Sequence, residues 1–220
     1  MGRSKCQDGH YRRECGNVER TVHSLRVFVR ATLKSFLTHM KAYFDPLDAS
    51  PMSHEAVEGV LEGKRVEVKG GGALAEKGFG VQVSESLWLT LVEAAYLVDK
   101  GELRVVEGEE KRNIGFEDLV KRASSMDNGF WQKLVVYTDL RDRGLRAQPL
   151  EGTSLILAEK KIKEGERRYM VLCLEEGVRI GFRELEGYIR RALESRRDLV
   201  LAIVDKDGNI SYYKVEKSLG

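Results

Sequence analysis

The sequence predicts an α/β protein of two small units, the second built on a mixed central sheet. Its 220 residues are enough for one or two hydrophobic cores. Short apolar runs typical of strands alternate with segments whose apolar residues recur at helical spacing. Several strand-like runs near the C-terminus contain few polar residues, which indicates a sheet covered on both faces. We expect a basic extension over 1–54, a first unit over 55–126 and a second unit over 127–220.

The extension combines a tail with one predicted helix. Residues 1–17 have the composition of a flexible tail, and Cys6, His10 and Cys15 lack the fourth ligand that a zinc site needs. Apolar residues at helical spacing over 18–44 predict an amphipathic helix whose remaining surface is rich in arginine and lysine. The first fifty residues hold nine Lys/Arg against five Asp/Glu. This helix could dock on a partner, contact RNA or stay solvated.

The first unit is predicted to contain three strands and two helices. The expected order is a strand over 60–68, a glycine-rich turn over 69–78, a strand over 79–83, a helix over 85–101 capped by Ser84, a strand over 103–108 and a helix over 115–126. The glycine-rich segment lacks the spacing of a P-loop and of a dinucleotide-binding loop. We therefore interpret it as a turn.

The second unit is predicted to have two helices and four strands. They are a helix over 130–144, strands over 154–160 and 169–174, a helix over 182–197, a strand over 199–205, a turn over 205–209 and a strand over 210–215. This order of elements predicts a mixed sheet.

The composition restricts the chemistry and the compartment. The net charge is +2, and all four histidines (His10, His23, His39 and His54) precede the first unit, so the body lacks the commonest general acid or base. No apolar run reaches the ~20 residues of a membrane span, and no signal peptide is evident. An odd cysteine count, with Cys173 in an apolar run, suits a reducing compartment. We expect a cytoplasmic protein, and abundant Lys and Glu with little Pro hint at a thermophile.

Two stretches of the second unit carry a family resemblance. They are VVYTDLRDRGL (Val135–Leu145) and GYIRRALESRRDLVLAIVDKDGNISYYKV (Gly187–Val215). With the segment that begins at Val57, they resemble the archaeal tRNA-intron (tRNA-splicing) endonuclease family over both units. The resemblance implies a nuclease-like second unit and cleavage of precursor tRNA at bulge–helix–bulge junctions without metal or cofactor.

The family chemistry implies a tyrosine, a histidine and a lysine. In the family, a ribose 2′-hydroxyl attacks the adjacent phosphate and leaves a 2′,3′-cyclic phosphate, which requires a base, an acid and a cation. The three slots of this triad fall on Ala158, Glu166 and Arg197 in this sequence. None keeps the family residue, and a glutamate with an ordinary pKa near 4.3 is ionised at neutral pH. The resemblance therefore predicts that the catalytic residues are missing.

The resulting hypothesis is a structural subunit that pairs with a catalytic chain, two plus two, and positions it on precursor tRNA. The resemblance implies that Arg190, Arg196 and Arg197 bind RNA. It implies that Glu175 and Glu176 belong to an acidic loop that enters a basic cleft of the opposing dimer. It also implies that Tyr212, Tyr213 and Val215 lie in a strand that pairs with a partner strand. Arg196 and Arg197 also suit a helix C-terminus by charge alone. The two glutamates also suit a solvated turn.

Two alternatives stay open at this point. One is an active metal-independent RNA endonuclease, working as a homodimer with residues other than the family triad. The other is a stand-alone RNA-binding module based on the basic helix of the extension.

Overall fold

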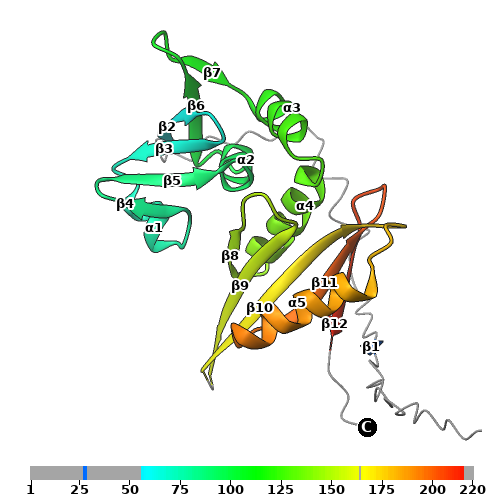
Figure 1. The fold of residues 1–220 in the computed structure, drawn as a ribbon. Coiled ribbons are helices and arrows are strands. Elements are labelled where there is room, and N and C mark those ends of the chain that lie inside the picture. The colour runs from blue at the N-terminus through cyan, green and yellow to red at the C-terminus, as the bar shows by residue number, and fades with distance from the viewer. Residues whose placement is uncertain (1–26, 29–55, 164, 216–220) are drawn as a thin grey trace, which may run out of the picture.

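The computed structural model describes residues 27–28, 56–163 and 165–215 and contains two mixed six-stranded sheets (Figure 1). The first sheet has the order β4-β5-β3-β2-β6-β7, in which β2 and β6 are parallel and the other neighbours antiparallel. Its strands are β2 Val57–Glu62, β3 Arg65–Lys69, β4 Val81–Val83, β5 Ser86–Thr90, β6 Leu103–Glu107 and β7 Arg112–Ile114, and its helices are α1 Gly72–Glu76, α2 Leu91–Asp99 and α3 Phe116–Met126. The predicted α/β class is confirmed.

The second sheet has the order β1-β12-β11-β10-β9-β8, in which only β10 and β11 are parallel. Its strands are β1 Val27–Phe28, β8 Arg146–Pro149, β9 Leu155–Ile162, β10 Gly165–Glu175, β11 Asp198–Val204 and β12 Ile210–Val215, and its helices are α4 Phe130–Asp142 and α5 Phe182–Glu194. Helix α4 covers one face and α5 covers the other (Figure 1). The prediction that both faces are covered is therefore confirmed.

One large core runs through both units. It joins side chains of the first sheet and of α2 and α3 to α4 and the adjacent face of the second sheet. Tyr137 of α4 lies at its centre with no exposed surface and packs edge-on against Tyr96 of α2, with ring centroids 5.5 Å apart. A second, smaller core lies between α5 and the opposite face of the second sheet. Because α4 is buried on two sides, it holds the two units together.

The end of α4 also binds the first unit through polar contacts. The guanidinium of Arg141 lies 3.7 Å from the ring centroid of Phe79 and donates to the carbonyl of Lys77 at 3.1 Å. The carboxylate of Asp142 accepts from the Tyr96 hydroxyl at 3.2 Å. Stacking of a guanidinium on an aromatic face adds to the area that it buries. The DLRDRG stretch that carries the family resemblance therefore helps to hold the second unit against the first.

The predicted helix over 85–101 is wrong in its first turn. Residues Ser86–Thr90 form strand β5, and the helix begins only at Leu91. Leu87 and Leu89 are fully buried on one face of this strand, which is the alternation of a half-buried sheet. The cap is Thr90 rather than Ser84, because Thr90 and Glu93 form a reciprocal capping box.

Three further predictions need correction. The strand predicted over 60–68 is a hairpin, in which β2 and β3 meet at a turn where Gly63 has φ +61°. The glycine-rich turn contains the short helix α1, and strands β7 and β8 were not predicted because each is too short to show a pattern. In the extension, Val27 and Phe28 form a strand instead of the predicted helix, and the rest of that prediction lies outside the described residues. None of the helices in the described ranges is long and apolar enough to span a membrane.

Candidate functional site

The end of α5 delivers Arg197 to the edge of the second sheet. The amide of Arg196 donates to the carbonyl of Leu193 at 3.1 Å, and the amide of Arg197 donates to that of Ala192 at 2.8 Å. This pair of bonds is a Schellman ending, which usually has glycine in the left-handed position. Here Arg196 has φ +52° in that position, a conformation that is unfavourable for a residue with a Cβ. The turn directs the next residue back onto the sheet.

Arg197 is held by a carboxylate of β9. Its Nη2 donates to Oε1 of Glu159 at 2.6 Å, and only 14% of the Arg197 side chain is exposed. Its Nη1 is buried and has no hydrogen-bond partner among the described residues. A buried guanidinium nitrogen without an acceptor is unfavourable, so the hydrogen bonds of Arg197 are only partly satisfied within the described residues.

Glu166 belongs to the same network of charges. Arg168 donates from Nε to Oε2 of Glu166 at 2.9 Å, and its Nε lies 3.8 Å from Oε1 of Glu159. The ion pairs therefore run from Arg197 through Glu159 and Arg168 to Glu166. Each of the two carboxylates therefore faces at least one guanidinium.

Ala158 lies apart from this network. Its neighbours on β9, Leu157 and Glu159, face α5 and the network, whereas Ala158 is fully buried on the α4 face. It lies directly opposite Tyr169 on β10. Because side chains alternate across a strand, a residue at 158 cannot face Arg197. The structure thus brings together two of the three predicted slots, Glu166 and Arg197, and leaves Ala158 in the core.

A cleft of about 320 Å³ opens beside Arg197 between the two units. Phe79 and Gln82 of the first unit line it, together with Arg146, Gln148 and Glu159 of the second. Arg146 donates to the carbonyl of Glu76 at 3.1 Å, so it is partly engaged. Among the described residues that line the cleft, the cationic groups suit binding of a phosphate, and none is a histidine.

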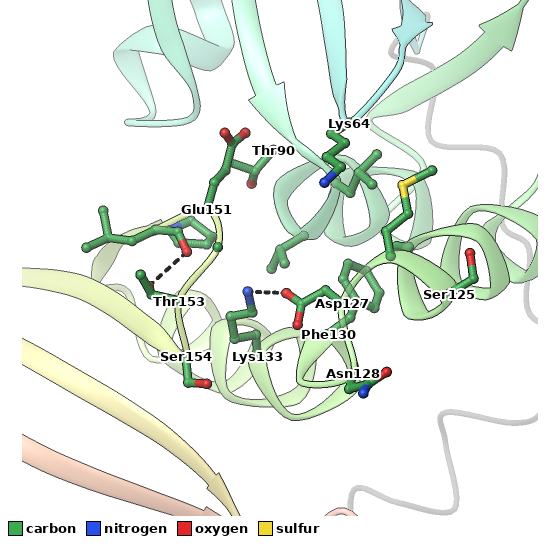
Figure 2. A pocket seen from close by; sticks show the side chains of 17 residues that line it. Lys64, Thr90, Ser125, Asp127, Asn128, Phe130, Lys133, Glu151, Thr153 and Ser154 are labelled. Atoms are coloured by element: carbon green, nitrogen blue, oxygen red, sulfur yellow. Dashed lines mark hydrogen bonds and ion pairs between the residues drawn. The ribbon is translucent and has the colours of Figure 1, made fainter. Parts of the chain in front are cut away.

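The second cleft between the units has a volume of about 670 Å³ and is shown in Figure 2. Lys133 of α4 is only 3% exposed, and its Nζ lies 2.5 Å from Oδ2 of Asp127. Lys64 enters from the first unit and has no ion pair with any described residue. Across the cleft, Glu151 is neutralised by two 2.7 Å hydrogen bonds from Arg65. The cleft therefore has a positive group available at its entrance.

The predicted acidic-loop residues and two of the predicted RNA-binding residues lie at the surface, whereas Arg197 is largely buried. Arg190 is exposed on α5, and Arg196 is exposed at the turn that follows this helix. Glu175 and Glu176 are exposed in the turn between β10 and α5, without an ion pair to any described residue. This acidic turn is followed closely by exposed apolar side chains, Val178 at 55% and Phe182 at 64% exposure.

The predicted assembly strand β12 has two different faces. The hydroxyl of Tyr212 donates to Oδ2 of Asp139 at 2.6 Å, so this side chain packs on α4 within the chain. Burial, with Asp139 nearby, raises the pKa of Tyr212. Tyr213 is half-buried, and Val215 packs against the smaller core on the α5 side. Within the described residues, the outer edge of β12 pairs with β1 at Lys214 and Val215.

Sequence reasoning missed the partners of Arg197. Glu159 and Arg168 were not singled out, although their positions next to the slots at 158 and 166 were a usable signal. The burial of Lys133 could not be foreseen, because it depends on the packing of α4 between two units. The described part of the chain contains no cluster of His, Cys, Asp or Glu that could hold a metal ion. Burial raises the pKa of the Cys173 thiol, and Cys6, His10 and Cys15 lie outside the described residues.

Comparison with known proteins covers both units. Residues 57–120 match the family model of the tRNA intron endonuclease N-terminal domain, and residues 130–212 match that of the tRNA intron endonuclease catalytic C-terminal domain. The chain is 36% identical over 142 residues to the tRNA-splicing endonuclease of Pyrococcus horikoshii, which covers 64% of this chain and 81% of that protein. It is 34% identical over 139 residues to that of Thermococcus kodakarensis (63% and 82%) and 33% identical over 145 residues to that of Methanococcus maripaludis (64% and 81%).

Proposed function

Because this chain belongs to the tRNA-splicing endonuclease family, we propose that it is a structural subunit of a heterotetrameric enzyme that removes introns from precursor tRNA. In this proposal, two copies pair with two copies of a catalytic chain in the cytoplasm. The partner cleaves the bulge–helix–bulge junctions, and this chain completes the assembly and positions the RNA.

The observation that carries the proposal is the content of the three catalytic slots. They hold Ala158, Glu166 and Arg197, and the sequence has no histidine after His54 that a shift of register could supply. The ion pairs support the same conclusion, because Glu166 faces Arg168 and Glu159 faces Arg197. Both carboxylates are thus already bound by cations of this chain.

We propose that assembly uses three surfaces, which are the acidic turn, the cleft between the units and the edge of β12. Glu175 and Glu176, free at the surface and followed by exposed apolar side chains, suit insertion into a positively charged cleft of the partner. The cleft with Lys64 at its entrance suits insertion of the corresponding acidic turn of the partner. The part of the β12 edge that pairs with no described strand suits pairing with a partner strand. For the domain division we propose the expected boundaries, an extension over 1–54 and units over 55–126 and 127–220.

The assembly proposal is tested by reversing the charge of the acidic turn. Glu175→Lys with Glu176→Lys should convert tetramers into dimers, because like charges facing a basic cleft cost several kcal/mol. Light scattering measures the mass of the complex. Glu109→Lys with Glu110→Lys, in an exposed turn of the first unit, is the matched control and should leave tetramers intact. Tetramers that persist in the first variant would remove the acidic turn from the assembly.

The function itself is tested by mixing. This chain alone should not cleave a bulge–helix–bulge RNA, either with or without added metal ions. Cleavage should appear when a family member that carries the tyrosine, histidine and lysine is added. Cleavage by this chain alone, at a rate that follows its concentration through purification, would contradict the proposal and favour the active-endonuclease alternative.

A further inference from the structure

The β9–β10 ribbon, residues 160–163 and 165–168, extends beyond its neighbours in the second sheet. Strand β8 pairs with β9 only as far as Glu159, and β11 pairs with β10 only from Tyr169 onward. Past these points the two strands pair only with each other and project from the body of the molecule (Figure 1). Every described side chain of the ribbon is exposed. A two-stranded ribbon without further support contributes little to stability.

The two faces of the ribbon differ in how their charges are used. Residues that are directly opposite in an antiparallel pair share a face. On the α5 side, Lys161 lies opposite Glu166, which also binds Arg168 at 2.9 Å. On the other side, Lys160 lies directly opposite Arg167, so two like charges face each other. The second side is called the cationic face below, and Lys163 lies in the adjacent turn.

The charges of the cationic face have no counterions within the described residues. Lys160, Lys163 and Arg167 make no hydrogen bond and no ion pair with any described residue. Like charges directly opposite in a sheet are destabilising, so the arrangement weakens the fold of the free chain. After its first fifty residues the sequence is balanced, with 28 Lys/Arg against 30 Asp/Glu (37 − 9 and 35 − 5), so this positive face is a local feature.

We propose that the cationic face of the β9–β10 ribbon binds the phosphate backbone of RNA, with Lys160 and Arg167 each contacting a phosphate. The inference rests on the proposed function for the identity of the RNA. An acidic protein surface is the less favoured ligand, because protein interfaces have an apolar centre and this face offers only Ile162, 37% exposed. Phosphate backbones, in contrast, are bound by exposed Lys and Arg without an apolar contact.

The test measures binding of the full chain to a bulge–helix–bulge RNA over a range of salt concentrations. Lys160→Gln with Arg167→Gln should raise Kd by roughly ten-fold and lower the slope of log Kobs against log salt by about 1.5, which corresponds to two phosphate contacts. Lys69→Gln with Lys121→Gln, two exposed lysines of the first unit, removes the same charge elsewhere and should leave the slope unchanged. The increase in Kd caused by Lys160→Gln should exceed that caused by Lys161→Gln, because Lys161 lies on the opposite face of the same ribbon.

Several outcomes would overturn the inference. Equal effects of Lys160→Gln and Lys161→Gln on RNA affinity would show that only net charge matters. Failure of the unaltered chain to bind RNA at low salt would show that RNA is not the ligand of this face. An unchanged RNA affinity with altered subunit assembly would assign the face to a protein partner. Loss of folding is not expected, because the double substitution removes a repulsion, and thermal unfolding checks this. Because binding is measured without cleavage, the result stands even if this chain proves to be catalytic.

Discussion

Glu93 and Arg197 are both charged side chains largely withdrawn from solvent, and the structure uses them differently. Glu93 is 1% exposed and accepts from the Gly80 amide at 2.8 Å and from the amide and hydroxyl of Thr90, both at 2.9 Å. Burial raises the pKa of Glu93 although these donors oppose the shift. Arg197 binds Glu159 through one nitrogen and leaves another nitrogen without a partner in the described residues.

The difference separates a structural charge from a charge with remaining binding capacity. A buried polar group whose hydrogen bonds are all satisfied holds its surroundings in one arrangement. A buried group that is only partly satisfied carries a desolvation penalty that an outside ligand can relieve. Glu93 fixes the capping box of α2 and the loop at Gly80, whereas Arg197 lines the cleft and has one buried donor without a partner in the described residues. In the slot that the resemblance assigns to the family lysine, this chain therefore has a positive charge.

The largest effect is expected at Glu93. Glu93→Ala leaves three part-buried donors without an acceptor, and each such loss costs about 1 kcal/mol or more, so the free energy of unfolding should fall by about 3 kcal/mol. Denaturant unfolding measures the change. Glu85→Ala, at an exposed position, is the control and should change stability by less than about 0.5 kcal/mol. A loss at Glu93 as small as in the control would show that its hydrogen bonds do not hold α2.

A smaller effect is expected at the hydroxyl of Tyr212. Tyr212→Phe removes its 2.6 Å bond to Asp139, and a hydrogen bond to a charged group contributes about 1.5–3 kcal/mol. Asp139 keeps its 2.8 Å ion pair with Arg143, so we expect the lower end of this range. Tyr213→Phe is the matched control on the same strand, because its hydroxyl has no partner among the described residues. Equal losses from both variants would exclude an anchoring role for Tyr212.

The turn at Arg196 should give a small effect of opposite sign. Arg196→Gly relieves a left-handed conformation and should raise the free energy of unfolding by about 1 kcal/mol or less, since glycine also gains entropy in the unfolded chain. Thermal unfolding measures this change, and RNA binding should weaken at the same time if Arg196 contacts phosphate. Glu194→Gly, within the last turn of α5, should be destabilising. A stability loss from Arg196→Gly would show that its side chain supports the fold.

The sequence predicts the second unit better than the first for physical reasons. The strands over 154–160, 169–174 and 199–205 are long and apolar, so their pattern has only one reading. In contrast, Ser86–Thr90 has five residues that run directly into a helix, and helical and strand periods cannot be separated over so short a segment. The capping box at Thr90 and Glu93 was a readable signal for the true helix start.

The sequence indicated which residues belong to the candidate site but not how their side chains are arranged. The family resemblance assigned slots to Glu166 and Arg197, and the structure links these two residues through Glu159 and Arg168. It could not show that Ala158 faces the other core, since a register error of one residue exchanges the two faces of a strand. Ala158→Tyr is therefore no simple test of catalysis, because a tyrosine at this fully buried position would overpack the core by about 1–3 kcal/mol or more.

The central claim is that this chain contributes no proton transfer to cleavage, and the most direct measurement is the single-turnover rate of the assembled enzyme with Glu166→Ala or Arg197→Ala in this chain. We expect both rates to stay almost unchanged under saturating RNA, because the partner supplies the acid and the base. A true general acid or base contributes about 10²-fold or more, nearly 3 kcal/mol of barrier. A loss of that size from Glu166→Ala, with folding and assembly intact, would contradict the account and make this chain catalytic.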